Sequence, residues 1–147
     1  MICDETYEYF VYGSECHVTL ASLPGMWDRT LTSYTFSKAY AMSGWRLGCI
    51  VGPQDLLEPL RKVHEHTASF VSPFVQAAGT AALDGPQDHI EKWRLDCESL
   101  RTIVAARLNE VPGRTCTVPQ GATFVFPRYS ANHSSAEVAM SMIEKAG

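Results

Sequence analysis

One stretch decides the fold of this chain: Thr35-Phe36-Ser37-Lys38-Ala39-Tyr40-Ala41-Met42-Ser43-Gly44-Trp45-Arg46-Leu47-Gly48. The segment before it, residues 29–35, is rich in β-branched and aromatic residues and predicts a strand. The segment after it, residues 45–51, is a second apolar run, which Gly52-Pro53 closes. The small residues in the middle therefore predict a tight connection between two buried elements.

Lys38 stands out in this stretch because it and Arg46 are the only cations between Thr35 and Gly52. An ammonium group in apolar surroundings costs several kcal/mol unless it is paired or neutralised. Formation of a Schiff base removes that cost, which makes Lys38 a candidate for covalent chemistry. The alternative is a solvated lysine in a turn between two strands, since lysine is rarely fully buried.

An acidic residue follows the short apolar run at the start of the chain. Residues 1–3 predict a strand, and Asp4 stands at its carboxyl end, where open α/β sheets place ligand groups. Tyr7 follows three positions later and completes an Asp-x-x-Tyr spacing. The alternative interpretation is a surface turn with ordinary solvated carboxylates.

The Asp4-x-x-Tyr7 spacing, followed by the lysine stretch, resembles the motifs of the class I/II aminotransferases, which are fold-type-I pyridoxal-phosphate enzymes. One departure is Thr35, because the family usually carries Ser or Gly at that position. The resemblance implies that Lys38 is the catalytic residue and forms a Schiff base with pyridoxal 5'-phosphate. The implied reaction transfers an amino group between an amino acid and a 2-oxo acid.

The resemblance also implies which residues bind the cofactor. Asp4 would pair with the pyridinium nitrogen, and Tyr7 would hydrogen-bond the phenolic oxygen of the ring. The phosphate group would be bound by Arg46, Thr35 and Ser37. A guanidinium suits this role because its planar fork is permanently charged and can bind a phosphate through two parallel hydrogen bonds.

The implied fold is α/β and is part of the fold-type-I PLP-transferase fold: part of the mixed sheet of the large domain, a long connecting helix and part of the small α+β domain. Residues 1–84 would form part of the large PLP-binding domain. Residues 85–111 would form the interdomain helix, and residues 112–147 part of the small C-terminal domain.

Apolar spacing predicts the helices of the first part of the chain. A helix should begin near Pro53, with its apolar side formed by Leu56, Leu57, Leu60 and Val63. A second helix, rich in small residues, should cover residues 76–83. The longest helix should end near residue 111 and carry one apolar stripe: Ile90, Trp93, Cys97, Leu100, Val104, Leu108 and Val111.

The last part of the chain changes in character. Residues 115–118 and 123–126 predict two short strands around Pro119-Gln120-Gly121. Ser134 is a typical N-cap residue for a helix over residues 135–145.

Composition excludes several classes of protein. The 147 residues carry a net charge of −4, and their twelve Lys and Arg residues are scattered, which argues against a nucleic-acid surface. No apolar run is long enough for a membrane span. Five cysteines without a C-x-x-C pair are typical of reduced thiols, and we expect a cytoplasmic protein. His64 and His66 do not share a helix face, and no further ligands complete a metal site around them.

Other functions remain open beside the aminotransferase hypothesis. A C–S lyase, a decarboxylase or a synthase of the same fold would keep Lys38 and Arg46, and a non-catalytic remnant would keep the fold alone. A nucleotide-binding protein is disfavoured because neither G-x-G-x-x-G nor G-x-x-x-x-G-K-[ST] occurs.

Several features of the family pattern do not occur here: the upstream phosphate-binding loop, the ring-stacking aromatic segment, the Asn-Pro motif and the downstream substrate-binding arginine. We therefore expect a truncated part of a longer pattern, with exposed apolar edges and faces near residues 1–3 and 29–51. In the family, a loop before the 76–83 helix reaches across a homodimer interface. Ser69 or Ser72 could occupy that position here.

Overall fold

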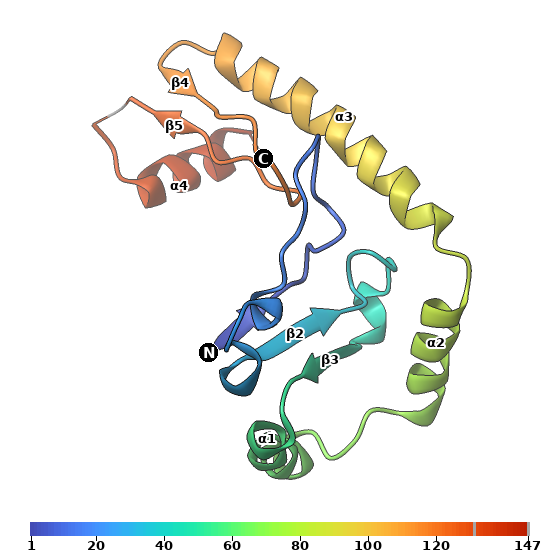
Figure 1. The fold of residues 1–147 in the computed structure, drawn as a ribbon. Helices are drawn as coiled ribbons and strands as arrows, with labels where there is room; N and C mark the ends of the chain where they lie inside the picture. Colours follow the sequence, from blue (N-terminus) through green and yellow to red (C-terminus); the bar gives the residue numbers. More distant parts are fainter. Residues whose placement is uncertain (131, 147) are drawn as a thin grey trace. The chain divides into compact units, whose positions relative to one another are not determined.

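The computed structural model describes residues 1–130 and 132–146 (Figure 1). The chain divides into two compact units, which are described separately below. Unit 1 contains Met1–Ser99 and Gln120–Thr123, and unit 2 contains Leu100–Pro119 and Phe124–Gly147. The division into a large domain, a connecting helix and a small domain stays a prediction.

Unit 1 is built on a three-stranded sheet of β1 (Ile2–Asp4), β2 (Leu31–Thr35) and β3 (Gly48–Val51). β2 lies in the middle, parallel to β1 and antiparallel to β3. The strand predicted over residues 29–35 is thus confirmed as β2. Because β1 and β2 are parallel and β3 is antiparallel to them, the carboxyl ends of β1 and β2 and the amino end of β3 meet at one edge of the sheet.

The strands differ sharply in their exposure. Thr30 and Thr32 are fully buried at 0% and 1%, and β2 contacts the 3₁₀ turn Leu20–Ser22. Every residue of β3 is exposed, including Ile50 and Val51, and Ile2 of β1 is exposed as well. The expectation of exposed apolar strand surfaces is therefore confirmed for β1 and β3, and it is wrong for β2.

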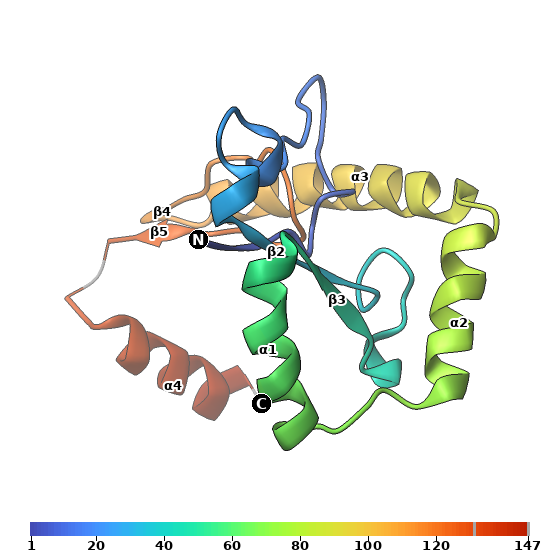
Figure 2. The same ribbon diagram turned by 60° about the horizontal axis from the view of Figure 1, so that its bottom comes forward.

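Two helices follow β3: α1 (Gln54–Thr67) and α2 (Pro73–Asp84). Pro53 is the N-cap of α1, and Pro73 lies in the first turn of α2, where a missing N–H group costs nothing. Figure 2 shows α1 alongside β3. Residues of β2, β3 and α1 line one open cavity of about 580 Å³, among them Ser33, Ile50 and Leu57.

The long helix is α3 (Asp88–Glu110), close to the predicted range. Its first half contributes Ile90 to the buried core of unit 1, against which Trp93 and Cys97 pack. The predicted stripe is wrong further along, because Leu100 is 59% exposed and Val104 is 40% exposed. The buried position in this half of the helix is Ala105, at 0%.

The core of unit 1 joins three segments that are far apart in sequence. Phe10 and Tyr12 follow β1, Ala39 lies in the lysine stretch and Ile90 lies in α3. Residues 120–122 form further hydrogen bonds with the segment that carries Phe10 and Tyr12. Tyr12 donates its hydroxyl hydrogen to the carbonyl of Ala122 at 2.6 Å, and the Ala122 amide donates to the Phe10 carbonyl at 2.8 Å.

Unit 2 contains a two-stranded sheet of β4 (Arg114–Thr115) and β5 (Arg128–Tyr129), followed by α4 (Ser135–Ala146). The strands predicted over residues 115–118 and 123–126 are therefore wrong. Asn109 explains where β4 ends, because its side chain accepts from the Cys116 amide at 2.8 Å and donates to the Cys116 carbonyl at 2.9 Å. These contacts take up the backbone groups that a longer strand would use.

The start of α4 matches its sequence signal. The Ser134 hydroxyl accepts from the Glu137 amide at 3.3 Å, and the Glu137 carboxylate accepts from the Ser134 amide at 2.7 Å. This reciprocal pair is a capping box, and the hydrogen bonds from Ser134 lower the pKa of Glu137. Within residues 1–130 and 132–146, no helix is both long and apolar enough to cross a membrane, and no cluster of metal-ligating side chains occurs.

Candidate functional site

The sheet topology of unit 1 brings the candidate residues to one edge. Asp4 ends β1, Lys38 lies three residues after the end of β2, and Arg46 lies two residues before β3 begins. Pairing of Thr35 with Gly48 closes the base of the connection between β2 and β3. Residues separated by more than forty positions in sequence therefore lie at the same sheet edge.

The connection that carries Lys38 is fixed by its apolar residues and its backbone. The Phe36 amide donates to the Leu47 carbonyl at 3.1 Å, and the Met42 amide donates to the Phe36 carbonyl at 3.1 Å. The side chains of Phe36, Ala39 and Met42 are buried. These anchors hold the loop and leave the lysine side chain directed away from the core.

The side chain of Lys38 is exposed. The apolar residues around it in the sequence had indicated a buried ammonium group, and the structure does not bear this out. The Lys38 Nζ lies 5.9 Å from the centroid of the Tyr7 ring. Tyr7 packs edge-to-face against the buried Phe10 ring, with centroids 6.3 Å apart. Lys38 and Tyr7, which the sequence assigned to one site, are thus brought together.

Asp4 is exposed, and its position is defined by the residue two places later. Its Oδ1 accepts hydrogen bonds from the Thr6 amide at 3.1 Å and from the Thr6 hydroxyl at 2.5 Å. This turn holds the carboxylate at the end of β1. Its orientation is therefore fixed within the segment that also supplies Tyr7.

Arg46 adopts the left-handed backbone conformation, with φ +52°, directly after a 3₁₀ turn over Ser43–Trp45. Its Nη1 donates to the Ser43 carbonyl at 2.8 Å, and its side chain is exposed. The guanidinium has five N–H donors, so this contact leaves capacity for an anion.

Thr35 and Ser37 differ in what they can offer to a phosphate group. The Thr35 hydroxyl accepts from the Ser37 amide at 3.1 Å and directs its only hydrogen to the Leu47 carbonyl at 3.5 Å. Thr35 thus holds the turn, and it would have to break the Leu47 contact to donate to another group. Ser37 is half-buried beside it.

The sequence reasoning missed Glu5, the most buried carboxylate beside the site, which is 4% exposed. It accepts hydrogen bonds from Thr19 and Leu20 and contacts His17. Strand alternation was the available signal, because neighbouring residues of a strand point to opposite faces. Asp4 and Glu5 could not both face solvent, and one of the two carboxylates needed buried partners.

A second missed feature is Tyr40, which packs against the rings of Phe36, Tyr9 and His89. Burial, followed by the neighbouring Tyr9 hydroxyl, raises the pKa of Tyr40 to about 12. Its hydroxyl donates to the Gln87 side chain at 3.1 Å. Tyr40 therefore stays neutral and packs the lysine loop against the start of α3.

Comparison with known proteins agrees with the family resemblance of the sequence motifs. The family model for aminotransferase class I and II matches residues 1–147. The chain is 42% identical over 127 residues to an aspartate aminotransferase from Rhizobium meliloti, covering 86% of this chain and 31% of the relative. It is 38% identical over 149 residues to aromatic-amino-acid aminotransferase 2 of Thermococcus litoralis, covering 99% and 38%.

The structure agrees with this result. The crystal structure of the aspartate aminotransferase from Rhizobium meliloti matches with a TM-score of 0.90 and 33% identity, over 99% of this chain and 39% of that one. The chain thus spans about a third of the length of the curated relatives that it matches. It belongs to the class I and II aminotransferase family and has the corresponding part of the fold-type-I fold.

Proposed function

We propose that this chain forms the lysine-bearing part of a pyridoxal-phosphate-dependent aminotransferase, which transfers an amino group between an amino acid and a 2-oxo acid. The observation that carries the proposal is the position of the Lys38 amine over the Tyr7 ring, at the sheet edge where Asp4 ends β1. Membership of the aminotransferase family supports the same reaction class.

The donor groups at this edge fit pyridoxal phosphate. The cofactor has an aldehyde, a basic ring nitrogen, a phenolic oxygen and a phosphate dianion. The edge offers an amine on Lys38, a carboxylate on Asp4 and a phenol on Tyr7. Arg46 and Ser37 offer hydrogen-bond donors for the phosphate, whereas the Thr35 hydroxyl is already engaged with Leu47.

When bound, the cofactor supplies an aldehyde that condenses with amines and a ring that withdraws electrons from the substrate Cα. Lys38 would hold the cofactor through its Nζ, and the same amine would in turn take up and return the proton at the substrate Cα. The Asp4 carboxylate would keep the ring nitrogen protonated. Tyr7 would hydrogen-bond the phenolic oxygen, and Arg46 would bind the phosphate.

We further propose that the full-length protein is a homodimer and that it is located in the cytoplasm. Supporting the first point, Phe70 and Phe74 are 73% and 71% exposed, and the loop before α2 places Ser69 in the left-handed conformation with φ +61°. Supporting the second, all five cysteines are free thiols. Sedimentation equilibrium of the full-length protein and of its F70S variant tests the dimer, and a monomeric full-length protein would contradict it.

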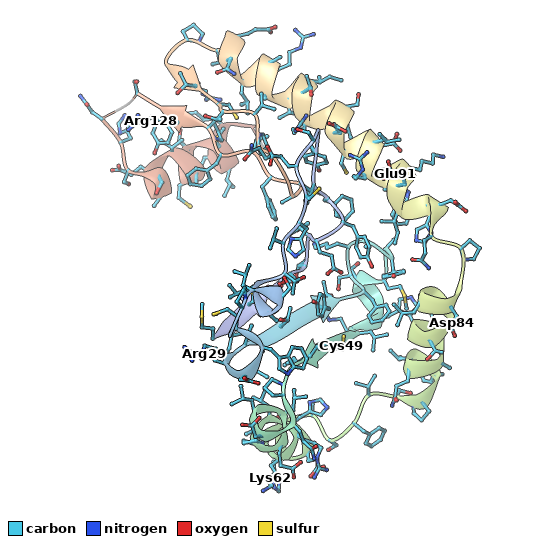
Figure 3. The ribbon with its side chains drawn as sticks, viewed as in Figure 1. Arg29, Cys49, Lys62, Asp84, Glu91 and Arg128 are labelled. Carbon is cyan, nitrogen blue, oxygen red and sulfur yellow. The ribbon has the colours of Figure 1, made fainter. Side chains whose placement is uncertain are left out.

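Reductive labelling tests the function. The 147-residue chain is incubated with pyridoxal phosphate, reduced with borohydride and mapped by mass spectrometry. We expect the pyridoxyl group on Lys38 and its loss in the K38R variant. Lys62 is the matched control because it is exposed and projects from α1 away from the sheet (Figure 3), so K62R should leave the labelling unchanged. Equal labelling of Lys38, Lys62 and Lys92 would contradict the proposal.

A further inference from the structure

The side chain of Glu5 connects the segment that supplies Asp4 and Tyr7 to residues 17–20. Its side chain is 2% exposed, and its carboxylate accepts hydrogen bonds from the Thr19 hydroxyl at 3.0 Å and the Leu20 amide at 3.3 Å. The His17 Nε2 lies 3.0 Å from the same carboxylate. One buried side chain thus ties the end of β1 to the segment over residues 17–20.

The backbone of Glu5 is held as firmly as its side chain. Its amide donates to the Ser33 carbonyl of β2 at 3.0 Å, and its carbonyl accepts from the Glu8 amide at 3.2 Å. Asp4 comes directly before it, and Tyr7 follows two positions later. Any shift of Glu5 would therefore move both residues that the proposed function assigns to the cofactor ring.

A buried carboxylate without partners would be strongly destabilising, so the contacts of Glu5 must offset the loss of water. Burial alone raises its pKa, but the hydrogen bonds from His17, Thr19 and Leu20 outweigh that effect and lower the pKa. The other ionisable groups that face it are Cys3, Glu8 and Tyr34. Glu5 is accordingly a charged and fully partnered group.

Glu5 does not belong to the ligand-binding set itself. Strand alternation directs it to the face opposite Asp4, and its oxygens are taken up by His17, Thr19 and Leu20. Its Oε1 also lies 3.6 Å from the Cys3 thiol, which donates to it. The Glu5 carboxylate can therefore affect the site only through the residues that it contacts.

We propose that Glu5 is a positioning residue: by binding His17, Thr19 and the Leu20 amide, its carboxylate fixes the backbone at the end of β1 and so aims Asp4 and Tyr7 at their ligand. What Asp4 and Tyr7 hold rests on the proposed function. The mechanical coupling between Glu5 and Asp4 does not.

Amide hydrogen exchange, followed by NMR on the full 147-residue chain, tests the coupling without any cofactor. Two amides report on it: Leu20 N–H, which donates to Glu5, and Thr6 N–H, which donates to the Asp4 carboxylate. In the E5Q variant, we expect both amides to exchange at least about tenfold faster, because a hydrogen bond to a charged group is lost. Glu8 is the matched control, so E8Q, which removes a neighbouring carboxylate, should leave both rates unchanged.

Two results would overturn the proposal. Faster exchange at Leu20 with an unchanged rate at Thr6 would mean that Glu5 anchors the 17–20 segment only. Unchanged rates at both amides would mean that the carboxylate anchors nothing. If E5Q does not fold, the isosteric T19V variant removes a single donor from the same carboxylate and should give a smaller change at the same two amides.

A second measurement separates this proposal from the proposed function. With pyridoxal phosphate bound, E5Q should shift the pH profile of the cofactor absorbance, since Asp4 is then less well aimed at the ring nitrogen, whereas E8Q should not. If wild-type Lys38 takes no label, the proposed function fails and the exchange result still stands. If Lys38 is labelled and Thr6 exchange does not respond to E5Q, the positioning role alone fails.

Discussion

The Nζ of Lys38 lies over the face of the Tyr7 ring, 5.9 Å from its centroid, although the two residues come from different segments of the chain. The ring is held at its edge by the buried Phe10. An ammonium over an aromatic face is attracted by the electron-rich π system. Under the proposed function, Tyr7 therefore has two separable roles: its ring positions the lysine, and its hydroxyl binds the cofactor.

Tyr7→Phe and Tyr7→Leu separate these two properties. Y7F keeps the ring, so we expect wild-type labelling of Lys38 by pyridoxal phosphate and borohydride, with an altered absorption spectrum of the bound cofactor. Y7L removes the ring as well. A cation–π contact at an exposed site contributes about 0.5–1 kcal/mol, so labelling should fall roughly two- to fivefold. Equal labelling of Y7F and Y7L would show that the ring does not position Lys38.

Arg46→Ala should weaken pyridoxal-phosphate binding by about 10- to 100-fold, because charge-assisted hydrogen bonds to the phosphate are lost. Alanine and arginine carry a similar strain at φ +52°, so the difference reports the guanidinium and not the backbone. Quenching of the neighbouring Trp45, which is 46% exposed, measures the affinity.

The controls for Arg46 come from the same chain. R46K keeps the charge without the planar fork and should bind with intermediate affinity. Arg61 on α1 is exposed and paired with Glu58 and Glu65, so R61A should bind pyridoxal phosphate like the wild type. A similar loss of affinity in R46A and R61A would exclude a specific phosphate contact at Arg46.

Local sequence was sufficient to predict the elements whose own residues determine their secondary structure. Enrichment in β-branched and aromatic residues predicted β2, and the helical spacing of apolar residues predicted α1. Local sequence was wrong for the strands of unit 2, because Asn109, a single side chain, occupies the backbone groups of Cys116 and ends β4 after Thr115. Such a contact has no signature in local composition.

The candidate site also has features that local sequence predicts and features that depend on contacts distant in sequence. Motif spacing named Lys38 and Tyr7, which lie together at one sheet edge. The exposure of Lys38 was not predictable, because it depends on how Phe36 and Ala39 turn the loop inward. Glu5 was overlooked because its partners at residues 17–20 lie in an irregular segment, which carries no periodic pattern.

The stability of the chain should depend on the ionisation of Glu5. The pKa of Glu5 is lowered in the folded chain, so its contribution to the free energy of unfolding is fully present above its unfolded value, about 4.3. The contribution is lost as pH falls through the folded pKa. E5Q should unfold with about 1–3 kcal/mol less free energy at pH 7. This difference should shrink below about pH 4 in urea titrations.

Glu8, a carboxylate whose pKa shifts in the opposite direction, provides the control for this pH dependence. Burial, followed by the charge of Glu5, raises the pKa of Glu8 in the folded chain. Glu8 therefore favours unfolding once pH rises above its unfolded value, and E8Q should be as stable as the wild type or more stable at pH 7. A difference between wild type and E5Q that stays constant down to pH 3 would exclude Glu5 as the titrating group.

Asn109 should be the most sensitive polar residue of unit 2. Its amide group donates to the carbonyls of Ala105 and Cys116 and accepts from the Cys116 amide. N109A leaves the Cys116 amide and carbonyl without these partners, and we expect a loss of about 1–3 kcal/mol in the free energy of unfolding by urea.

Asn109→Asp tests whether the effect comes from these hydrogen bonds. The aspartate still accepts from the Cys116 amide but cannot donate to the Cys116 carbonyl, so N109D should lie between the wild type and N109A at neutral pH. N109D should recover stability as pH falls, because a protonated carboxyl regains one donor. Equal losses in both variants at every pH would mean that Asn109 acts through its packing, and the end of β4 would then need another cause.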